Sequence, residues 1–135
     1  MPSRRAFIKN SVVTASIITL SRVMPVKASG NIFSGIIYTK DNPGKWEKKV
    51  GSHLPFITIE GRKVILNTKH PMSKKHYIVR HTLVLGDGTV VGSQTFYPDV
   101  KKAMSSYDLP AGYKGKIYGT SFCNLHDFWV NETMV

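Results

Sequence analysis

A cysteine and a histidine three positions apart, Cys123 and His126, are the residues with the clearest capacity for metal chemistry. A thiolate and an imidazole together suit iron, copper or zinc, and they do not suit magnesium or calcium. Cys123 is the only cysteine in the sequence, and a single cysteine is more often a small buried hydrophobic side chain than a ligand. The pair therefore predicts a metal site only if further ligands join it.

Three further histidines are candidate ligands. His70 and His76 lie six residues apart in a basic loop that contains a proline, and His53 precedes a predicted strand. This spacing does not place two ligands on one helix face, because neighbours there are three or four residues apart. We therefore predict a loop that curves back until its two imidazoles converge. Together with Cys123 and His126, these side chains would form a site with five ligands.

The remaining histidine, His81, lies in a predicted strand five residues after His76. Successive side chains of a regular strand point to opposite faces, so an odd separation puts these two histidines on opposite sides. We predict no ligand role for His81.

The first 28 residues are typical of an export signal. Arg4 and Arg5 form a twin-arginine pattern, residues 11–20 are mostly apolar without an acidic residue, and small residues end the segment. The alternative is an amphipathic or membrane-anchoring helix, but the apolar stretch is shorter than the ~20 residues of a membrane span. We predict a twin-arginine signal here, a single domain over residues 29–135, and a periplasmic or other extracytoplasmic location. Export in the folded state would suit a protein that is loaded with metal beforehand.

The charge of the chain is strongly basic. The sequence has 19 Lys and Arg against 8 Asp and Glu, a net charge of +11. Five of the basic residues and none of the acidic ones fall in the predicted signal, so the remainder has 14 basic and 8 acidic residues, or +6. Such a surface attracts small anions, and because the basic residues are scattered we predict no nucleic-acid partner. We expect Lys48, Lys49 and the Lys74–Lys75 pair near the site, and Lys101 and Lys102 far from it.

Beyond residue 43 the sequence reads as short strands separated by turn residues. Two hairpins are predicted, one at Glu60 and Gly61 and one at Asp87 and Gly88, because each pair stands between two apolar runs. The pattern, which contains no long helix, predicts an all-β, immunoglobulin-like antiparallel sandwich or barrel. The predicted elements are strands at 56–59, 63–66, 77–85, 89–96 and 116–123, the last of them central, a helical turn within 100–107 and an edge strand at 128–135.

Three motifs in order resemble superoxide reductase. They are His53-Leu54-Pro55, then His70-Pro71-Met72 with His76-Tyr77-Ile78, then Cys123-Asn124-Leu125-His126-Asp127-Phe128-Trp129. The resemblance is closest to the single-iron form, neelaredoxin, and to the C-terminal domain of desulfoferrodoxin, and it covers residues 46–129. Two-iron relatives add an N-terminal module with four more cysteines, which we do not expect in a chain with one.

The resemblance implies a seven-stranded immunoglobulin-like β-barrel that binds one iron per chain. It implies equatorial ligation by His53, His70, His76 and His126, with Cys123 as the axial ligand. The catalytic roles would fall to Cys123 and His126, with the thiolate donating electron density to the iron and the backbone amides after Cys123 tuning the sulfur. The implied reaction is reduction of superoxide to hydrogen peroxide. The implied partners are rubredoxin or a periplasmic equivalent as electron donor and further copies of the chain in a dimer or tetramer.

The sequence departs from the family immediately before the first histidine, where relatives carry a Glu-Lys pair. Gly51 and Ser52 occupy those positions. Two alternatives remain open. The pair is displaced to Glu47 and either Lys48 or Lys49, or the sixth position of the iron holds only solvent.

Two other functions fit parts of the pattern. A cupredoxin-like electron carrier is also an exported β-sandwich with Cys, His and usually Met ligands around copper. Met134 lies eight residues after His126, however, which is too far for the compact ligand loop of that class. A non-catalytic iron- or zinc-binding protein is the other alternative, and it would have a closed site.

Overall fold

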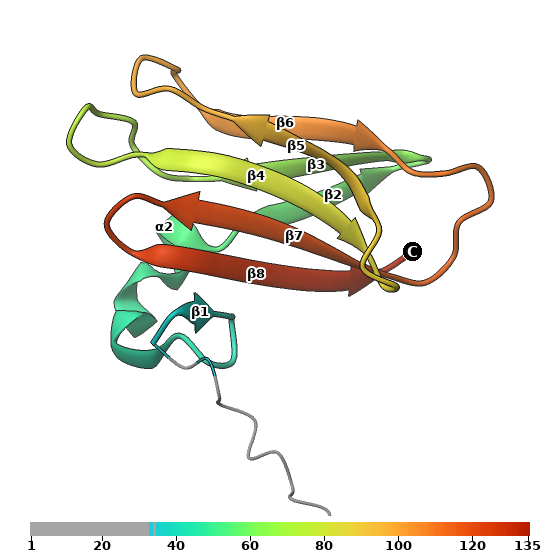
Figure 1. Cartoon of the computed structure of the whole chain (residues 1–135), viewed down its shortest axis with the longest axis horizontal. Helices are drawn as coiled ribbons and strands as arrows, with labels where there is room; N and C mark the ends of the chain where they lie inside the picture. Colours follow the sequence, from blue (N-terminus) through green and yellow to red (C-terminus); the bar gives the residue numbers. More distant parts are fainter. Residues whose placement is uncertain (1–32, 34) are drawn as a thin grey trace, which may run out of the picture. The chain divides into compact units, whose positions relative to one another are not determined.

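The computed structural model describes Phe33 and residues 35–135, which form two facing β-sheets (Figure 1). The larger sheet has the strand order β1-β8-β7-β4-β5, and the smaller has the order β2-β3-β6. The elements are β1 (Ile37–Tyr38), the 3-10 helix η2 (Gly44–Lys49), the single-turn helix α2 (Val50–His53), β2 (Phe56–Glu60), β3 (Lys63–Thr68), β4 (Ile78–Leu85), β5 (Val90–Thr95), β6 (Ala103–Asp108), β7 (Lys116–Cys123) and β8 (Asp127–Met134).

The predicted hairpins are present. Gly61 turns β2 into β3 with a φ of 62°, a left-handed conformation that glycine adopts without a steric penalty. Gly88 has a φ of 90° in the turn between β4 and β5, where the Asp87 carboxylate accepts a hydrogen bond from the backbone N–H of Thr89 at 2.9 Å. These turns set the pairing of the strands on either side of them.

The two sheets enclose an apolar core that is supplied by the inward-facing residues of each strand. In β3, Val64 and Leu66 are fully buried and alternate with more exposed neighbours. They pack against Leu83 of β4 and Ile117 of β7. As predicted, β7 is a central strand, paired with β4 on one side and β8 on the other. The position of β7 explains why its C-terminal residue, Cys123, is fully buried.

The predicted helical turn within 100–107 is wrong, because this segment contains strand β6, which pairs with β3. Ala103 and Ser105 are buried, whereas Met104 and Ser106 are exposed, which is the two-residue period of a half-buried strand. The fold is an immunoglobulin-like sandwich, as predicted, but the two sheets do not close into a barrel. The strand count differs from seven because the short β1 adds a parallel partner to β8.

The segment between β1 and β2 is helical, which the sequence pattern did not predict. η2 and α2 follow each other through residues 44–53, with a non-helical backbone at Trp46. None of the helices in the described part of the chain has the length and apolar character needed to cross a membrane. The predicted signal over residues 1–28 lies outside the described residues.

Candidate metal centre

Three chain segments converge at one end of the sandwich and carry the five candidate ligands (Figure 1). Helix α2 ends with His53, and the connection from β3 to β4 carries His70 and His76. The tight connection from β7 to β8 carries His126 and begins directly after Cys123. These segments are distant in the sequence, so only the packing of the two sheets brings them together.

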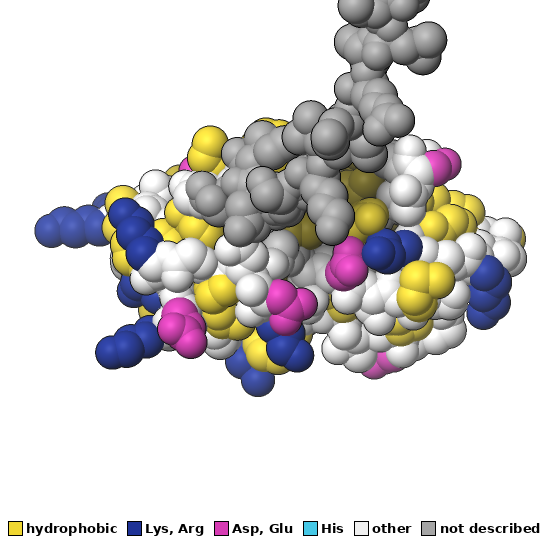
Figure 2. Space-filling model, turned by 90° about the horizontal axis from the view of Figure 1, so that it is seen from below, with side chains coloured by type: hydrophobic (Ala, Val, Ile, Leu, Met, Phe, Trp, Pro, Cys, Tyr) yellow, Lys and Arg dark blue, Asp and Glu magenta, His cyan; other side chains and the backbone are white. Residues whose placement is uncertain are grey.

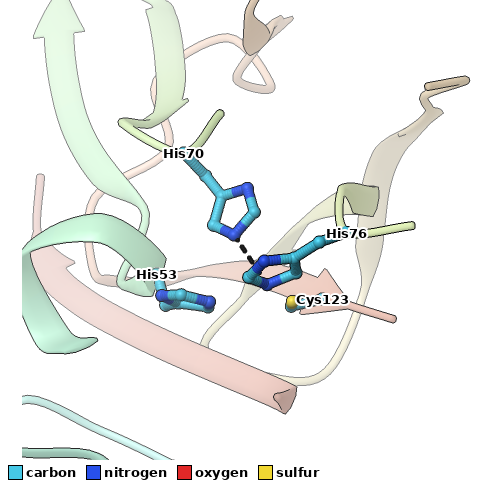
Figure 3. Close-up of side chains that lie close together, drawn as sticks. All are labelled: His53, His70, His76 and Cys123. Carbon is cyan, nitrogen blue, oxygen red and sulfur yellow. Dashed lines mark hydrogen bonds between the residues drawn. The ribbon is translucent and has the colours of Figure 1, made fainter. Parts of the chain in front are cut away.

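The side chains point at a common centre, as Figure 3 shows for four of the five. His70 Nε2 lies 3.0 Å from His76 Nε2, His76 Nε2 lies 3.0 Å from His126 Nδ1, and His126 Nδ1 lies 3.0 Å from His53 Nε2. The rings of His53 and His70 are also adjacent, with centroids 4.5 Å apart. A square with edges of this length has its centre roughly 2.1 Å from each corner, which matches a metal–imidazole bond.

Hydrogen bonding alone does not account for this arrangement. Each imidazole nitrogen carries one proton or one lone pair in the plane of its ring. His76 Nε2 and His126 Nδ1 each have two nitrogen neighbours at 3.0 Å, and one proton or lone pair cannot serve both well. A cation at the centre would accept all four lone pairs at once, so the residues fit a bound metal ion.

Cys123 completes the donor set from the buried side. Its side chain is fully buried, its Sγ lies 3.6 Å from His126 Nδ1, and it falls within 4.8 Å of the donor nitrogens of the other three histidines. Burial raises the pKa of the Cys123 thiol, and the backbone N–H groups of Leu125 and His126 act against this by hydrogen bonding to the sulfur. Both belong to the backbone amides after Cys123 that were expected to tune the sulfur.

The four imidazoles are neutral at pH 7, the form that binds a metal. The pKa of His53 is lowered to about 3 and that of His70 to about 4, mainly by burial and also by the nearby imidazoles. Burial also lowers the pKa of His76 and of His126, and the positive charge of Lys49 is the next cause for each.

The end of α2 orients His53. The ring nitrogen that faces away from the centre, Nδ1, lies 3.2 Å from the carbonyl oxygen of Lys49 and 2.8 Å from the hydroxyl of Ser52. A proton on Nδ1 donates to the carbonyl and leaves the lone pair of Nε2 for a metal. Ser52, which occupies the position of the family's lysine, therefore contributes to ligand orientation.

A small closed turn positions His76. Ser73 and His76 exchange two backbone hydrogen bonds of 3.0 and 3.2 Å, so the chain reverses and brings His76 back to His70, as predicted. Asn124 then holds this turn from the β7–β8 connection. Its side chain donates to the carbonyl of Lys75 at 3.0 Å and accepts from the backbone N–H of Tyr77 at 2.9 Å, on either side of His76.

Two tryptophans contact the backbone or ring of His126. The indole N–H of Trp129 donates to the His126 carbonyl at 3.0 Å, and the Trp46 ring meets the His126 ring edge-on with centroids 4.7 Å apart. Sequence reasoning missed the roles of Asn124 and Trp46. The position of Asn124 directly after Cys123 could have indicated its role. No local pattern linked Trp46 to His126, which lies far along the chain.

His81 is not part of the cluster. It lies between the sheets, where its ring nitrogens are each 2.8 Å from a hydroxyl, that of Thr68 and that of Ser105. Burial lowers the pKa of His81 to about 4.

Among the three residues considered as a displaced Glu-Lys pair, Lys49 has the clearest relation to the site. Its charge lowers the pKa of His70, His76 and His126, whereas neither Glu47 nor Lys48 is a cause of any shift there. Glu47 is exposed, and among the described contacts no hydrogen bond or ion pair joins it to the five candidate ligands.

Two lysines lie closer to the cluster than predicted, and a methionine lies far from it. Lys101 and Lys102 were predicted to lie far from the site, and this is wrong, since they line a cavity of about 310 Å³ together with Lys69 and His70. Met134 pairs with Lys116, at the opposite end of β7 from Cys123. A copper ligand set that combines Cys123 with this methionine is therefore excluded.

The family model for desulfoferrodoxin matches residues 44–132. A superoxide reductase (neelaredoxin) from Ignicoccus hospitalis is 24% identical with a TM-score of 0.64, over 76% of this chain and 96% of that one. The superoxide reductase from Treponema pallidum is 26% identical with a TM-score of 0.51, over 61% and 67% of the two chains. The single-iron superoxide reductase from Giardia intestinalis is 23% identical with a TM-score of 0.57, over 62% and 98%. No curated protein sequence matches the chain.

The family match covers more than half of the chain and spans all five residues of the cluster. The structural matches show the same fold in superoxide reductases. The chain is a member of the desulfoferrodoxin family.

Proposed function

We propose that this protein is a superoxide reductase, an oxidoreductase that holds one iron per chain with His53, His70, His76, His126 and Cys123. The observation that carries the proposal is the ring of four imidazole nitrogens, joined by three N···N distances of 3.0 Å, beside a buried cysteine sulfur. Imidazole and thiolate ligands together suit iron, copper or zinc, and membership of the desulfoferrodoxin family favours iron among these.

The bound ferrous iron would supply the single electron that, with two protons, converts superoxide into hydrogen peroxide. The protein's own residues determine from which side the anion approaches. The sulfur of Cys123 is fully buried, whereas the rings of His76 and His126 are partly exposed. Superoxide therefore approaches the four imidazoles from the solvent side, away from the buried thiolate. Solvent on that side supplies the protons.

Lys49 attracts the anion in this proposal and replaces the lysine that relatives carry at the position of Ser52. Its carbonyl orients His53 at 3.2 Å, and its side chain is near enough to act electrostatically on three of the imidazoles. A positive charge at the mouth of a site raises the local concentration of a small anion. Glu47 has no such electrostatic effect on the candidate ligands, so we assign the sixth position of the iron to solvent.

The proposal extends to the setting of the enzyme. The twin-arginine pattern at Arg4 and Arg5 supports export of the folded, iron-loaded chain, with residues 29–135 as the functional domain. The electron donor would be rubredoxin or a periplasmic equivalent, and the enzyme would act as a dimer or tetramer, by resemblance to the family.

The test combines metal analysis with the stoichiometry of superoxide consumption. We expect about one iron per chain and a blue colour on oxidation, from thiolate-to-ferric charge transfer. With a reductant present, reduction yields one hydrogen peroxide for each superoxide consumed, whereas dismutation yields one for every two and also releases dioxygen. Dismutation stoichiometry, or an iron-loaded protein that does not react with superoxide, would contradict the proposal.

A further inference from the structure

A hydrogen-bonded group of buried polar side chains lies between the two sheets. It consists of His81, Thr68, Ser105 and Ser121, whose exposed fractions are 0, 2, 7 and 0%. Thr68 Oγ1 is 2.8 Å from His81 Nε2 and 3.0 Å from Ser121 Oγ, and His81 Nδ1 is 2.8 Å from Ser105 Oγ. We call these four residues the core polar network.

The core polar network joins the two sheets. His81 and Ser121 face each other on the neighbouring strands β4 and β7 of the larger sheet. Thr68 and Ser105 belong to β3 and β6 of the smaller sheet. The network therefore links four strands across the sandwich, where the rest of the core holds the sheets together by apolar contact.

The hydrogen bonds determine how the His81 ring is oriented. With the Thr68 hydroxyl donating to Ser121, the Thr68 oxygen accepts the proton of His81 Nε2, and His81 Nδ1 accepts from the Ser105 hydroxyl. Each buried polar atom that loses its partner costs about 1–3 kcal/mol. Only one relative placement of the two sheets satisfies all the members, whereas apolar side chains would tolerate small shifts.

The network is connected through the backbone to two of the proposed ligands. The carbonyl of Thr68 accepts a 2.8 Å hydrogen bond from the backbone N–H of His70, immediately after β3 ends. Ser121 precedes Cys123 by two residues on β7, and both side chains face the interior. The bond between Thr68 and Ser121 thus connects the strand that leads to His70 with the strand that ends at Cys123.

We propose that the core polar network, centred on His81, is a positioning device that sets the separation between His70 and the Cys123 sulfur and so tunes the metal centre. This inference rests on the proposed metal site, and it assigns no ligand role to His81. Groups that orient ligands without touching the metal typically change affinity or activity 10- to 100-fold when they are removed.

The experiment uses the full chain, with Co²⁺ as the probe for affinity and the ferric charge-transfer band as the probe for geometry. Thr68→Val keeps the shape of the side chain but removes the hydroxyl, and His81→Leu removes both nitrogens. Thr68→Ser and His81→Gln each retain a group able to make the Thr68–His81 contact. Ile117→Val is the control, since it removes one buried methyl group near the end of β7 opposite Cys123 and lies outside the core polar network.

We expect Thr68→Val and His81→Leu to weaken Co²⁺ binding about 10- to 100-fold and to shift the charge-transfer band. Thr68→Ser and His81→Gln should restore both properties. Ile117→Val should lower the melting temperature and change the Co²⁺ affinity and the charge-transfer band little. If Thr68→Val and His81→Leu lower the melting temperature only, the network is structural and the positioning role is refuted. If His81→Leu does not fold, the comparison of Thr68→Val with Thr68→Ser tests the positioning role.

The outcomes separate this inference from the proposed function. A wild-type protein that binds no Co²⁺ and no iron would refute the metal centre, and the positioning role with it. A wild-type protein that binds both metals but does not reduce superoxide would refute the proposed reaction only, because the variants would still report on ligand position.

Discussion

At the scale of single residues, the candidate site combines one buried sulfur, that of Cys123, with the nitrogens of four imidazoles. Cys123 is fully buried below the imidazoles and receives backbone hydrogen bonds from Leu125 and His126. Such bonds lower the basicity of a ligating thiolate and influence its bond to a metal. The visible spectrum of the oxidised protein is therefore the most direct measurement of whether Cys123 is bound to iron.

Cys123→Ser should remove the visible band of the ferric protein, because an alkoxide or hydroxyl has no comparable charge transfer to iron. Absorption spectroscopy of the iron-reconstituted variant measures this. Leu125→Ala is the control, since the replaced side chain is exposed and the backbone N–H that serves the sulfur remains. An unchanged band in Cys123→Ser would show that the axial assignment is wrong.

His81 should make the stability of the metal-free protein depend on pH. Burial lowers its pKa from 6.5 to about 4, so between these values the unfolded chain binds a proton that the folded chain does not. The free energy of unfolding should therefore fall as the pH drops from about 6.5 to about 4, by at most roughly 3 kcal/mol.

Denaturant unfolding of wild type and His81→Gln at a series of pH values measures this contribution. The histidines of the metal cluster titrate in both proteins, so the difference between the two curves isolates His81. Parallel curves would mean that the His81 ring is not held in its neutral form by the core.

At the scale of elements, two connections determine where the ligands of the β3–β4 loop lie. The turn from Ser73 to His76 reverses the chain, and Asn124 of the β7–β8 connection binds the backbone on both sides of His76. The metal site is therefore assembled from loops that are hydrogen-bonded to one another, on ends of strands that the sheets hold rigidly.

Asn124→Ala should weaken metal binding about 10- to 100-fold, because both bonds to the His76 turn are lost while every ligand remains. Asn124→Asp should have an intermediate effect, since the carboxylate can accept from Tyr77 but cannot donate to the Lys75 carbonyl. Competition titration with a chelator gives the three affinities. Equal affinities in wild type and both variants would show that the turn holds its shape without Asn124.

At the scale of the whole molecule, the distribution of charge governs encounters with an anion. Basic side chains project along the periphery of the face in Figure 2, with Asp and Glu among them, and do not gather in one patch. Among the described residues the one ion pair joins Lys116 and Glu132. The excess of 14 basic over 8 acidic residues in residues 29–135, a net charge of +6, is thus spread over the surface and attracts small anions.

The bimolecular rate with superoxide should fall as salt is added, because the screening length shrinks from about 10 Å at 0.1 M to about 3 Å at 1 M. Lys49→Gln should slow this step and reduce its salt dependence, with the iron spectrum retained. Lys48→Gln is the matched control, since its side chain is exposed and acts on none of the cluster histidines. Pulse radiolysis measures the rates.

Replacing Lys101 and Lys102 together should have a smaller effect that is still detectable, because both line the cavity beside His70. Equal losses from Lys48→Gln and Lys49→Gln would mean that net charge alone matters. In that case Lys49 would not replace the family's missing lysine.

Export should depend on Arg4 and Arg5. Replacing both with lysine should leave iron-loaded precursor in the cytoplasm, since twin-arginine recognition requires the pair. Cell fractionation followed by iron analysis of the purified protein measures this. Continued export of the double variant would indicate the general secretory route, by which the chain would fold and bind iron after transport.

The sequence by itself determined the local features of this protein and its family. Turn residues at Gly61 and Gly88 predicted both hairpins, since backbone conformation at such positions depends on the residue itself. The spacing of Cys123 and His126, and the order of the histidine motifs before them, pointed to the desulfoferrodoxin family that the family model then showed. These signals are local or ordered along the chain, so no tertiary contact was needed to detect them.

Tertiary structure decided which of these residues meet and at what distance. Residues 103–108 form a strand because β3 supplies a partner for their backbone, a pairing that no local pattern specifies. The same packing brings Lys101 and Lys102 to His70, and it places Lys49 near imidazoles that follow it by more than twenty residues. It also buries His81 among hydroxyls from three other strands. Such contacts depend on how two sheets pack, and that information is spread over the whole core.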